Sequence, residues 1–401
     1  MLKLNIFSYV YWPEQFLINE MAEDIVQRGY EINVLTGLPN YPKGDFYDGF
    51  SLAGGPYLQE HKGVKIRRYP IFARKTGFPR LMMNYISHLL GALSIKNKIP
   101  QADWAFVFAT SPITTAIPAI FWARRNKAKV CIWLQDLWPD SVAAVGATNR
   151  NSILYKILGK MVAWIYKNTD LILIQSPGFA DNLKEFGYKG PSHVIPNWAP
   201  GLDFKDATVP SWLNDLPAKF TVTFAGNVGK AQAIDTVIEA AKILKDKEHI
   251  QFLVVGDGSE LERVRGIARA EDLQNVQFYG RKPIEDMPGL FKRSDALLVS
   301  LKKDPIFART IPSKVQAYMA AGKPLVGSLD GVGSQVIQEA QAGFTAPAEN
   351  STELAGVLLK MAELTDVERQ KLGDNARHYF SQNYEKGRII SHIIEHLERY
   401  K

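Results

Sequence analysis

The chain has 401 residues, of which 46% are apolar and 22% are charged, and its formal net charge is +7. This length exceeds what a single hydrophobic core usually covers, so we expect two domains. The single cysteine, Cys131, lies in an apolar run, which excludes an internal disulfide framework and fits a reducing compartment. The N-terminal residues do not resemble a signal peptide, and we therefore expect a cytoplasmic location.

The first half of the chain alternates apolar, β-rich runs with helical stretches, which predicts a parallel sheet with crossover helices. The predicted strands cover residues 4–10, 31–37, 64–70, 104–109, 129–135 and 170–176. Helices are predicted between them, for example over 19–28 and 153–167. The uncharged run 105–123 approaches the length of a membrane span, but Pro112 and Pro118 divide it into a buried strand, a turn and a helix.

Residues 61–98 form a basic segment with nine Lys or Arg residues and no Asp or Glu. Within it, residues 80–95 read as a mostly apolar helix. Basic flanks around such a helix predict binding to an anionic membrane surface. The alternative is a core helix between basic loops, and the sequence leaves both open. Nucleic acid is not predicted as a partner, because no recognised binding motif accompanies the charge.

The second half repeats the pattern of strand and helix. Its predicted strands cover residues 220–226, 250–256, 276–280, 296–301 and 324–328, and its predicted helices cover 233–244, 260–269 and 283–293. Residues 196–217 are rich in Pro, Asp and Asn and read as a linker, and the chain after residue 350 reads as continuous helix. The predicted fold class is α/β, with two Rossmann-like, doubly wound domains over residues 1–200 and 201–382.

A helix whose N-terminus binds an anion is predicted between residues 310 and 324. Pro312 and Ser313 suit its first positions, and Gly322 suits its end. Lys314 opposes the usual preference for acidic groups in the first turn, so we expect a negatively charged ligand there. Backbone amides, a hydroxyl and an ammonium at one point suit a diphosphate. The alternative is an ordinary amphipathic helix with a solvated lysine.

Three loops of the second half follow predicted strands and carry suitable chemistry. They are residues 226–229 with Gly226, Asn227 and Gly229, residues 256–260 with Asp257 and Gly258, and residues 309–314. Ligands of open α/β sheets bind at the carboxyl ends of strands, so we expect all three loops at one crevice. The second loop lacks the third glycine of a dinucleotide fingerprint, and the first lacks the spacing of a phosphate-binding nucleotide triphosphatase loop.

With these loops and two further motifs, YWPE at 11–14 and IPNW at 195–198, the chain resembles glycosyltransferases of the two-domain GT-B fold, family 4, also called group 1. The stretches 133–141 and 312–324 resemble the WbuB-like fucosaminyltransferases that extend envelope polysaccharides. The resemblance implies two domains that face a central cleft. It also implies that a C-terminal helix, over 383–401, crosses back to the N-terminal domain.

The chemistry that the resemblance implies is retaining transfer of a sugar from a UDP-sugar, such as UDP-glucose or a UDP-N-acetyl amino sugar. The implied acceptor is a lipid-linked or growing polysaccharide, and the implied location is the inner face of the plasma membrane. No cofactor and no metal are expected, which agrees with the lack of an acidic cluster in the second domain. Fixed positive charge then has to stabilise the departing diphosphate.

Departures from the family pattern change which residues serve the donor. Asn227 and Gln232 stand where many relatives place an arginine and a lysine. A dianionic leaving group still needs compensation, so Lys314, the amides around Ser313, and Arg309 or Lys230 become the candidates. We expect Lys314 and Arg309 to act in catalysis.

Two glutamates common in relatives are also replaced, by Arg309 and Ala317. The usual ribose contact therefore cannot occur at Ala317, and Gln316 is the candidate replacement. For contact with the nucleobase of the donor, the resemblance points to Arg281, with Asp257 and Gly258 nearby. Arg281 also suits a solvated strand end. A capping role is the favoured interpretation of Glu260.

On the acceptor side, Glu14, Gln135 and Asp136 are the candidates. Asp136 follows a predicted buried strand and could accept the proton of the acceptor hydroxyl, or it could brace the loop with Trp138. For Glu14, contact with the sugar or diphosphate and a helix-cap role both stay open. Asp140 is a weaker candidate for the base.

Residues 392–396 match the HxxEH pattern of zinc peptidases, but they lie on an amphipathic final helix without an evident third ligand, so no metal site is predicted. Two further functions stay open beside transfer. One is a sugar-nucleotide-binding protein without catalysis, because the glutamate pair and two cations are replaced. The other is a GT-B epimerase that acts on a UDP-amino sugar.

Overall fold

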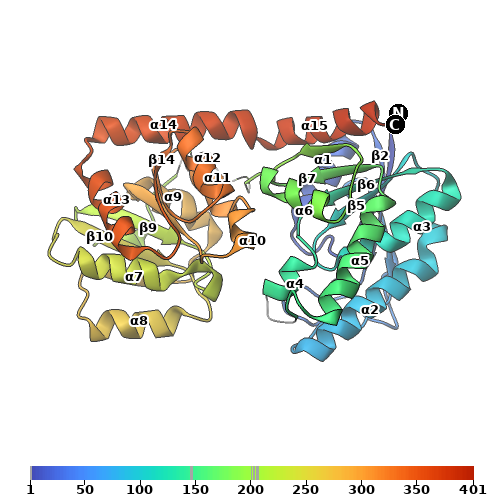
Figure 1. The fold of residues 1–401 in the computed structure, drawn as a ribbon, viewed down its shortest axis with the longest axis horizontal. Helices are drawn as coiled ribbons and strands as arrows, with labels where there is room; N and C mark the ends of the chain where they lie inside the picture. Colours follow the sequence, from blue (N-terminus) through green and yellow to red (C-terminus); the bar gives the residue numbers. More distant parts are fainter. Residues whose placement is uncertain (1, 145–147, 200, 202–203, 205–206) are drawn as a thin grey trace. The chain divides into compact units, whose positions relative to one another are not determined.

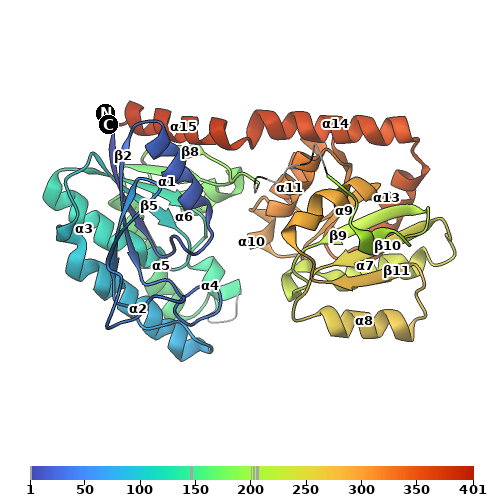
Figure 2. The same cartoon turned by 180° about the vertical axis from the view of Figure 1, so that it is seen from behind.

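The computed structural model describes residues 2–144, 148–199, 201, 204 and 207–401. The chain forms two compact units, each built on its own sheet (Figures 1 and 2). Unit 1 comprises Met1–Asn197 and Gly387–Lys401, and unit 2 comprises Trp198–Lys386.

The sheet of unit 1 has eight strands in the order β3-β4-β2-β1-β5-β6-β7-β8, and all neighbours are parallel except β3 and β4. The strands are β1 (Lys3–Ser8), β2 (Glu31–Gly37), β3 (Leu58–His61), β4 (Val64–Tyr69), β5 (Trp104–Ala109), β6 (Lys129–Leu134), β7 (Leu171–Ile174) and β8 (Ser192–Val194). The central strands are buried on both faces, which explains their continuous apolar sequences. The edge strands β3 and β8 were not predicted, because they are short and half exposed.

Helices cover both faces of this sheet. They are α1 (Leu17–Gln27), α2 (Phe78–Ile95), α3 (Ala116–Asn126), α4 (Asp140–Ala144), α5 (Ile153–Lys167), α6 (Ala180–Glu185) and α15 (Lys386–Arg399), with short 3-10 turns η1 (Lys96–Lys98), η2 (Ile113–Thr115) and η3 (Pro177–Phe179). One core packs α2, α3, α5 and α6 onto the sheet and takes Ala105 and Val107 from β5. On the opposite face, the Nε1–H of Trp104 donates to the Leu397 carbonyl of α15 at 3.1 Å. The C-terminal helix is therefore part of unit 1.

The two ends of the chain meet beside Asp103. Its carboxylate accepts from the Lys3 backbone N–H at 2.8 Å and pairs with the Lys401 ammonium at 2.9 Å. Figure 2 shows the two termini next to each other.

The uncharged run 105–123 is divided as predicted, into β5, η2 and α3. Among the described residues, no helix combines the length and apolar character needed to cross a membrane.

Unit 2 has a six-stranded, fully parallel sheet in the order β11-β10-β9-β12-β13-β14. The strands are β9 (Phe220–Ala225), β10 (Ile250–Val255), β11 (Val276–Gly280), β12 (Ala296–Ser300), β13 (Leu325–Ser328) and β14 (Gly343–Ala346). The helices are α7 (Ile234–Ile243), α8 (Leu261–Ala270), α9 (Met287–Arg293), α10 (Pro305–Ala308), α11 (Ser313–Ala321), α12 (Val332–Glu339), α13 (Ser351–Glu363) and α14 (Asp366–Asn383), with turns η4 (Ser211–Leu213), η5 (Lys230–Gln232) and η6 (Ile284–Asp286). One core packs α7, α8 and α13 on one face, and another packs α9, α11, α12 and α14 on the other. The predicted class, two doubly wound α/β domains, is confirmed.

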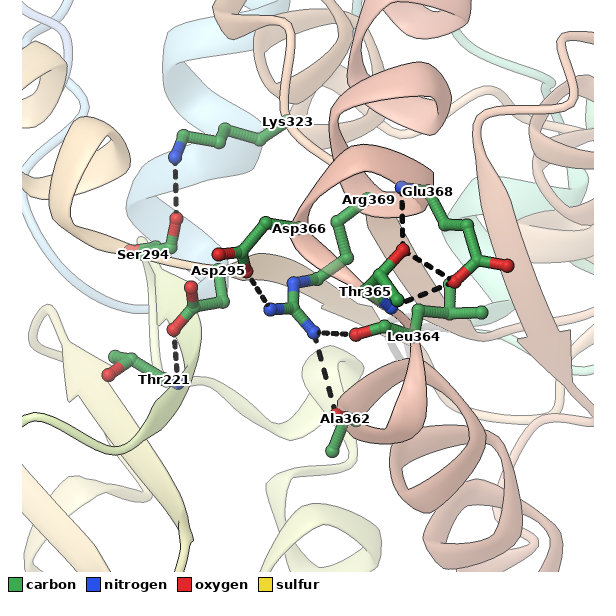
Figure 3. Close-up of polar contacts among 10 residues, drawn as sticks. All are labelled: Thr221, Ser294, Asp295, Lys323, Ala362, Leu364, Thr365, Asp366, Glu368 and Arg369. Atoms are coloured by element: carbon green, nitrogen blue, oxygen red, sulfur yellow. Dashed lines mark hydrogen bonds and ion pairs between the residues drawn. The ribbon is translucent and has the colours of Figure 1, made fainter.

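Polar contacts tie the amino ends of β9 and β12 to each other and to Lys323, which follows α11 (Figure 3). Asp295, just before β12, accepts from the Thr221 N–H of β9 at 2.8 Å, and Lys323 donates to the Ser294 carbonyl at 2.7 Å. Arg369 of α14 lies over the Phe220 ring at 5.3 Å. These contacts hold the end of the sheet opposite to the loops 226–229 and 256–260.

Candidate active site

The glycine loops after β9 and β10 lie against each other at the carboxyl end of the sheet. The Gly226 N–H donates to the Val255 carbonyl at 2.8 Å, and the Val228 N–H donates to the Asp257 carbonyl at 2.9 Å. A Cβ on Gly256 would lie 1.8 Å from the Gly226 carbonyl oxygen. This contact, together with a φ of +147° at Gly256, is open only to glycine. Backbone, rather than side chains, therefore forms this wall of the site.

Lys314 brings the third loop to the first. Its Nζ donates to Gln232 Oε1 at 2.8 Å and lies 4.8 Å from the centre of the Phe224 ring. The lysine stem also lies beside Gly226, where a Cβ would come within 2.8 Å of Lys314 Cε. Burial lowers the pKa of Lys314 to about 8. The ammonium is thus held in a poorly solvated place, where an anion would gain most from it.

Gln232 lies where the family resemblance led us to expect a lysine, and its amide oxygen orients Lys314. Sequence reasoning treated this residue as a lost cation. The structure gives it a positive role, because it fixes the direction of the cation that remains. No local pattern pointed to this role, since the two residues are 82 positions apart.

The start of α11 faces the same loops. Pro312 is its N-cap residue and provides no side-chain cap, and the first turn contains no acidic residue. The amides of Ser313 and Lys314 are first-turn donors, which a helix leaves without an intrahelical partner. Tyr318 fixes the helix to the end of β9, because its hydroxyl lies 3.1 Å from both the N–H and the carbonyl oxygen of Ala225. Sequence reasoning missed Tyr318.

The other predicted donor residues lie around this centre with different exposure. Asn227, Asp257 and Ser313 are exposed, and the Asp257 carboxylate accepts from the Gly258 N–H at 2.7 Å. Gly229 and Gln316 are buried.

Two arginines and one glutamate complete the set. Arg309 ends α10 and is half-buried, and Arg281 follows β11 and is exposed. The favoured interpretation of Glu260 was wrong. It stands at the N-cap position of α8 but makes no side-chain cap, because its carboxylate pairs with Arg263 Nε at 2.7 Å.

In unit 1, Glu14 organises two loops. Its carboxylate is buried and accepts from the N–H groups of Tyr11 at 3.2 Å, Asn40 at 2.8 Å and Tyr41 at 2.7 Å. Burial raises the pKa of Glu14, and these three backbone donors oppose that rise. The helix-cap alternative is wrong, because the N-cap residue of α1 is Phe16.

Asp136 lies two residues beyond the carboxyl end of β6, directly after Gln135. Ser111 donates to Oδ2 of Asp136, and Trp138 Nε1–H donates to Ser111 Oγ at 2.9 Å. Burial raises the pKa of Asp136, while hydrogen bonds from Ser111, Ser141 and the Leu137 backbone act against the rise. A half-buried carboxylate with a raised pKa and a hydroxyl neighbour is chemically suited to accept a proton.

Gln135 and Asp140 flank this carboxylate and differ in what they offer a ligand. Within the described part of the chain, the buried Gln135 Nε2 has no hydrogen-bond partner. Asp140 is buried and accepts from Arg150 at 2.7 Å and from the Tyr155 hydroxyl at 2.8 Å. Asp140 therefore holds α4 to α5, whereas Gln135 can still donate.

Across the described residues, no group of three or more His, Cys, Asp or Glu side chains is arranged to hold a metal ion. In the HxxEH segment, the His396 ring stacks on the His193 ring with 3.9 Å between their centres. Ile389, Ile390, Ile393, Ile394 and Leu397 of the same helix are buried. This segment therefore belongs to an amphipathic helix that packs its apolar face against unit 1.

Two family models match this chain. The model described as "Glycosyl transferase 4-like domain" matches residues 17–198, and "Glycosyl transferases group 1" matches residues 214–379. The chain is a group 1 glycosyltransferase of the GT-B fold. The predicted family and the predicted class of enzyme are thereby confirmed.

Among curated relatives of this glycosyltransferase is the probable glycosyltransferase WbjE of Pseudomonas aeruginosa, 26% identical over 64% of either chain. The match thus spans less than two thirds of WbjE. The putative colanic acid biosynthesis glycosyl transferase WcaI of Escherichia coli is 26% identical over 80% of this chain and 82% of WcaI.

Two solved structures support the fold of the glycosyltransferase. Sucrose-phosphate synthase from Thermosynechococcus elongatus superposes with a TM-score of 0.75 at 16% identity, covering 100% of this chain and 99% of the synthase. HepE from Anabaena, solved with UDP, gives a TM-score of 0.70 at 16% identity and full coverage of both chains.

Proposed function

We propose that this glycosyltransferase moves a sugar from a UDP-sugar to a lipid-linked or growing polysaccharide acceptor, with retention of configuration and without a metal. The observation that carries the proposal is the meeting of Lys314, the open first turn of α11 and the backbone wall of Gly226 and Gly256. A solved relative in fold, HepE, is described in complex with UDP and with UDP-glucose. The name of WcaI refers to colanic acid biosynthesis, which supports an envelope polysaccharide as the product.

In this proposal the diphosphate lies against the first turn of α11. The amides of Ser313 and Lys314 donate to its oxygens, and the Lys314 ammonium, held in place by Gln232, donates to them with its other N–H groups. An anion at this place raises the pKa of Lys314 from about 8, so the lysine is fully charged when the bond to the sugar breaks. Positive charge that is already in position stabilises the leaving group without reorganisation.

Arg309, Arg281, Asn227, Asp257 and Gln316 keep their predicted roles around the donor as proposals. Arg309 compensates charge on the departing diphosphate, and Gln316 contacts the ribose. Asn227, Asp257 and Arg281 follow the carboxyl ends of β9, β10 and β11. Arg309 lies at the end of α10, and Gln316 lies within α11.

On the acceptor side we propose Asp136 as the general base, with Glu14 shaping the neighbouring loops and Gln135 donating to the acceptor through Nε2. The raised pKa of Asp136 brings its basicity closer to that needed for a sugar hydroxyl. The Ser111 hydroxyl holds the carboxylate and keeps one oxygen oriented.

We further propose that the protein works at the inner face of the plasma membrane, as the basic segment 61–98 suggested. The structure excludes two cations of this segment from membrane binding. Arg68 is buried and donates to the Gly37 carbonyl at 3.1 Å, and Lys62 pairs with Glu23 at 2.8 Å, so neither is a free surface cation. In this proposal, the residues that bind the membrane surface are those of α2 and of the loop before it. The closer likeness to WbuB-like fucosaminyltransferases likewise stays a prediction.

Calorimetric titration with UDP tests the donor site. Lys314→Ala removes one charge-assisted contact worth about 1.5–3 kcal/mol, so we expect Kd to rise roughly 10- to 100-fold. Lys360→Ala is the matched control, because Lys360 is an exposed lysine of α13 that lies over the Phe344 ring. Equal UDP affinity in the wild type and Lys314→Ala would remove Lys314 from the site.

A further inference from the structure

Helix α2 is inverted with respect to an ordinary surface helix. The side chains that it buries are Asn84, His88 and Ala92. Met83, Ile86 and Leu90 are exposed, and Ile86 and Leu90 keep about 58% and 60% of their accessible surface. Surface helices normally bury their apolar stripe, so packing within this chain does not account for the outward apolar ridge.

The buried polar side chains of α2 are fully engaged, which fixes this orientation. Asn84 Nδ2 donates to the Phe72 carbonyl at 2.6 Å, and the His88 ring contacts the Tyr69 hydroxyl at 2.7 Å and Thr115 Oγ1 at 3.0 Å. Turning the helix to bury its apolar ridge would leave these groups without partners, at a cost of about 1–3 kcal/mol each.

Helix α5 carries a second apolar ridge beside the first. Its first two turns expose Ile153, Leu154 and Ile157. Between α2 and α5 lies a hollow of about 190 Å³, lined by apolar side chains that include Leu89, Leu158 and Met161 (the helices are labelled in Figure 1). An apolar cavity of about 150 Å³ is known to stay dry and to bind small hydrocarbons. This hollow is therefore large enough for a stretch of a hydrocarbon chain.

The exposed charges on the helices α2, α3 and α5 have one sign. The helices α2, α3 and α5 contain no Asp or Glu. Their exposed basic residues are Arg80, Arg124, Arg125, Lys156, Lys160 and Lys167. Arg80, Lys156 and Lys160 lie within two residues of side chains that line the hollow. An apolar hollow with cations beside it suits a lipid whose head group is anionic.

The hollow reaches the candidate base. Trp138 is one of its walls, and the Trp138 indole donates to the same Ser111 hydroxyl that holds Asp136. Tyr85 also lines it, and burial raises the pKa of Tyr85. Arg74 lies near the same helix, because its N–H donates to Asn40 Oδ1 at 3.0 Å and Asn84 of α2 donates to the same oxygen at 3.4 Å.

We propose that this hollow binds the head-proximal part of the hydrocarbon chain of a phosphate-bearing lipid acceptor. The phosphate lies toward Arg74, and the sugar hydroxyl that receives the new bond lies toward Asp136. The inference rests on the proposed function and names its acceptor class. An acceptor lipid is favoured over a bilayer acyl chain, because Trp138 in the wall of the hollow contacts Ser111, which holds Asp136.

Binding of farnesyl phosphate to the full-length protein tests this site, with farnesol and inorganic phosphate as partial ligands. Leu158→Trp fills the hollow, and Leu154→Asp places a charge at its exposed edge. Each variant should raise the Kd for farnesyl phosphate at least tenfold. Val367→Asp is the matched control, because Val367 is an exposed apolar residue of unit 2. Farnesol and inorganic phosphate should each bind at least tenfold more weakly than farnesyl phosphate.

Several outcomes would overturn the inference. Unchanged farnesyl phosphate binding in Leu158→Trp and Leu154→Asp would exclude the hollow, and equal binding of farnesol would exclude the anionic head. Binding to phosphatidylglycerol vesicles without binding of farnesyl phosphate would assign the surface to the bilayer. A dimer that Leu154→Asp dissociates in sedimentation would assign it to a second copy. UDP affinity, measured on the same samples, reports the donor site separately and should not change in any variant.

Discussion

Gly256→Ala tests whether the backbone wall of the donor site depends on close approach of two loops. The new Cβ would lie 1.8 Å from the Gly226 carbonyl oxygen, which is backbone and cannot turn aside. The residue would also have to keep a φ of +147°, which an L side chain rarely adopts. Steric overlap of this kind costs about 1–3 kcal/mol, and a strained backbone costs about 1–3 kcal/mol more.

We therefore expect Gly256→Ala to destabilise unit 2 by about 2–6 kcal/mol, which lowers its melting temperature by roughly 5–20 °C. The displaced loop should also weaken UDP binding. Differential scanning calorimetry and UDP titration measure both effects. Gly266→Ala is the control, because a Cβ at this exposed position of α8 meets nothing within 4 Å. That variant should be stabilised by about 0.5–1 kcal/mol. Wild-type stability and UDP affinity in Gly256→Ala would refute the reasoning.

Three further predictions concern unit 1. Asp136→Asn should lower kcat by about 10²- to 10⁴-fold in a transfer assay while UDP affinity stays unchanged, because general-base catalysis is lost. Ser152→Ala should destabilise unit 1 by about 1 kcal/mol in urea unfolding, because Ser152 accepts from the Tyr155 N–H at 3.0 Å as the N-cap of α5. Burial lowers the pKa of His88 to about 3, so the unfolded chain binds more protons than the folded chain between about pH 3 and 6.5. The contribution of His88 is therefore present above about pH 6.5 and is lost as the pH falls, by about 1.4 kcal/mol between pH 7.5 and 5.5 in urea unfolding.

Controls separate these effects from general damage. Ser152→Asp keeps a capping oxygen and should stay near wild-type stability. His88→Gln lacks the titrating ring, so it should lose less stability than the wild type over the same pH interval. An equal loss in both proteins would show that other groups carry the pH dependence. An Asp136→Asn variant that transfers sugar at the wild-type rate would move the base elsewhere.

Features coded by neighbouring residues were predictable from the sequence. The apolar runs 104–109 and 129–135 predicted β5 and β6, and the segment 153–167 predicted α5 with its observed bounds. The glycine loops and the start of α11 were located in the same way, because strand ends, glycines and helix starts are signals within a few residues. The edge strands β3 and β8 were not predicted, because they are too short and too exposed for such a pattern.

What only the tertiary structure decided are pairings between distant residues. Gln232 directs Lys314, Tyr318 fixes α11 to β9, and Glu14 gathers the N–H groups of a loop more than 20 residues away. The outward apolar ridge of α2 belongs to the same group, since Asn84 and His88 turn inward to partners on other elements. A sequence specifies local propensity directly, but the burial of a charge or an amide depends on which elements the fold places around it.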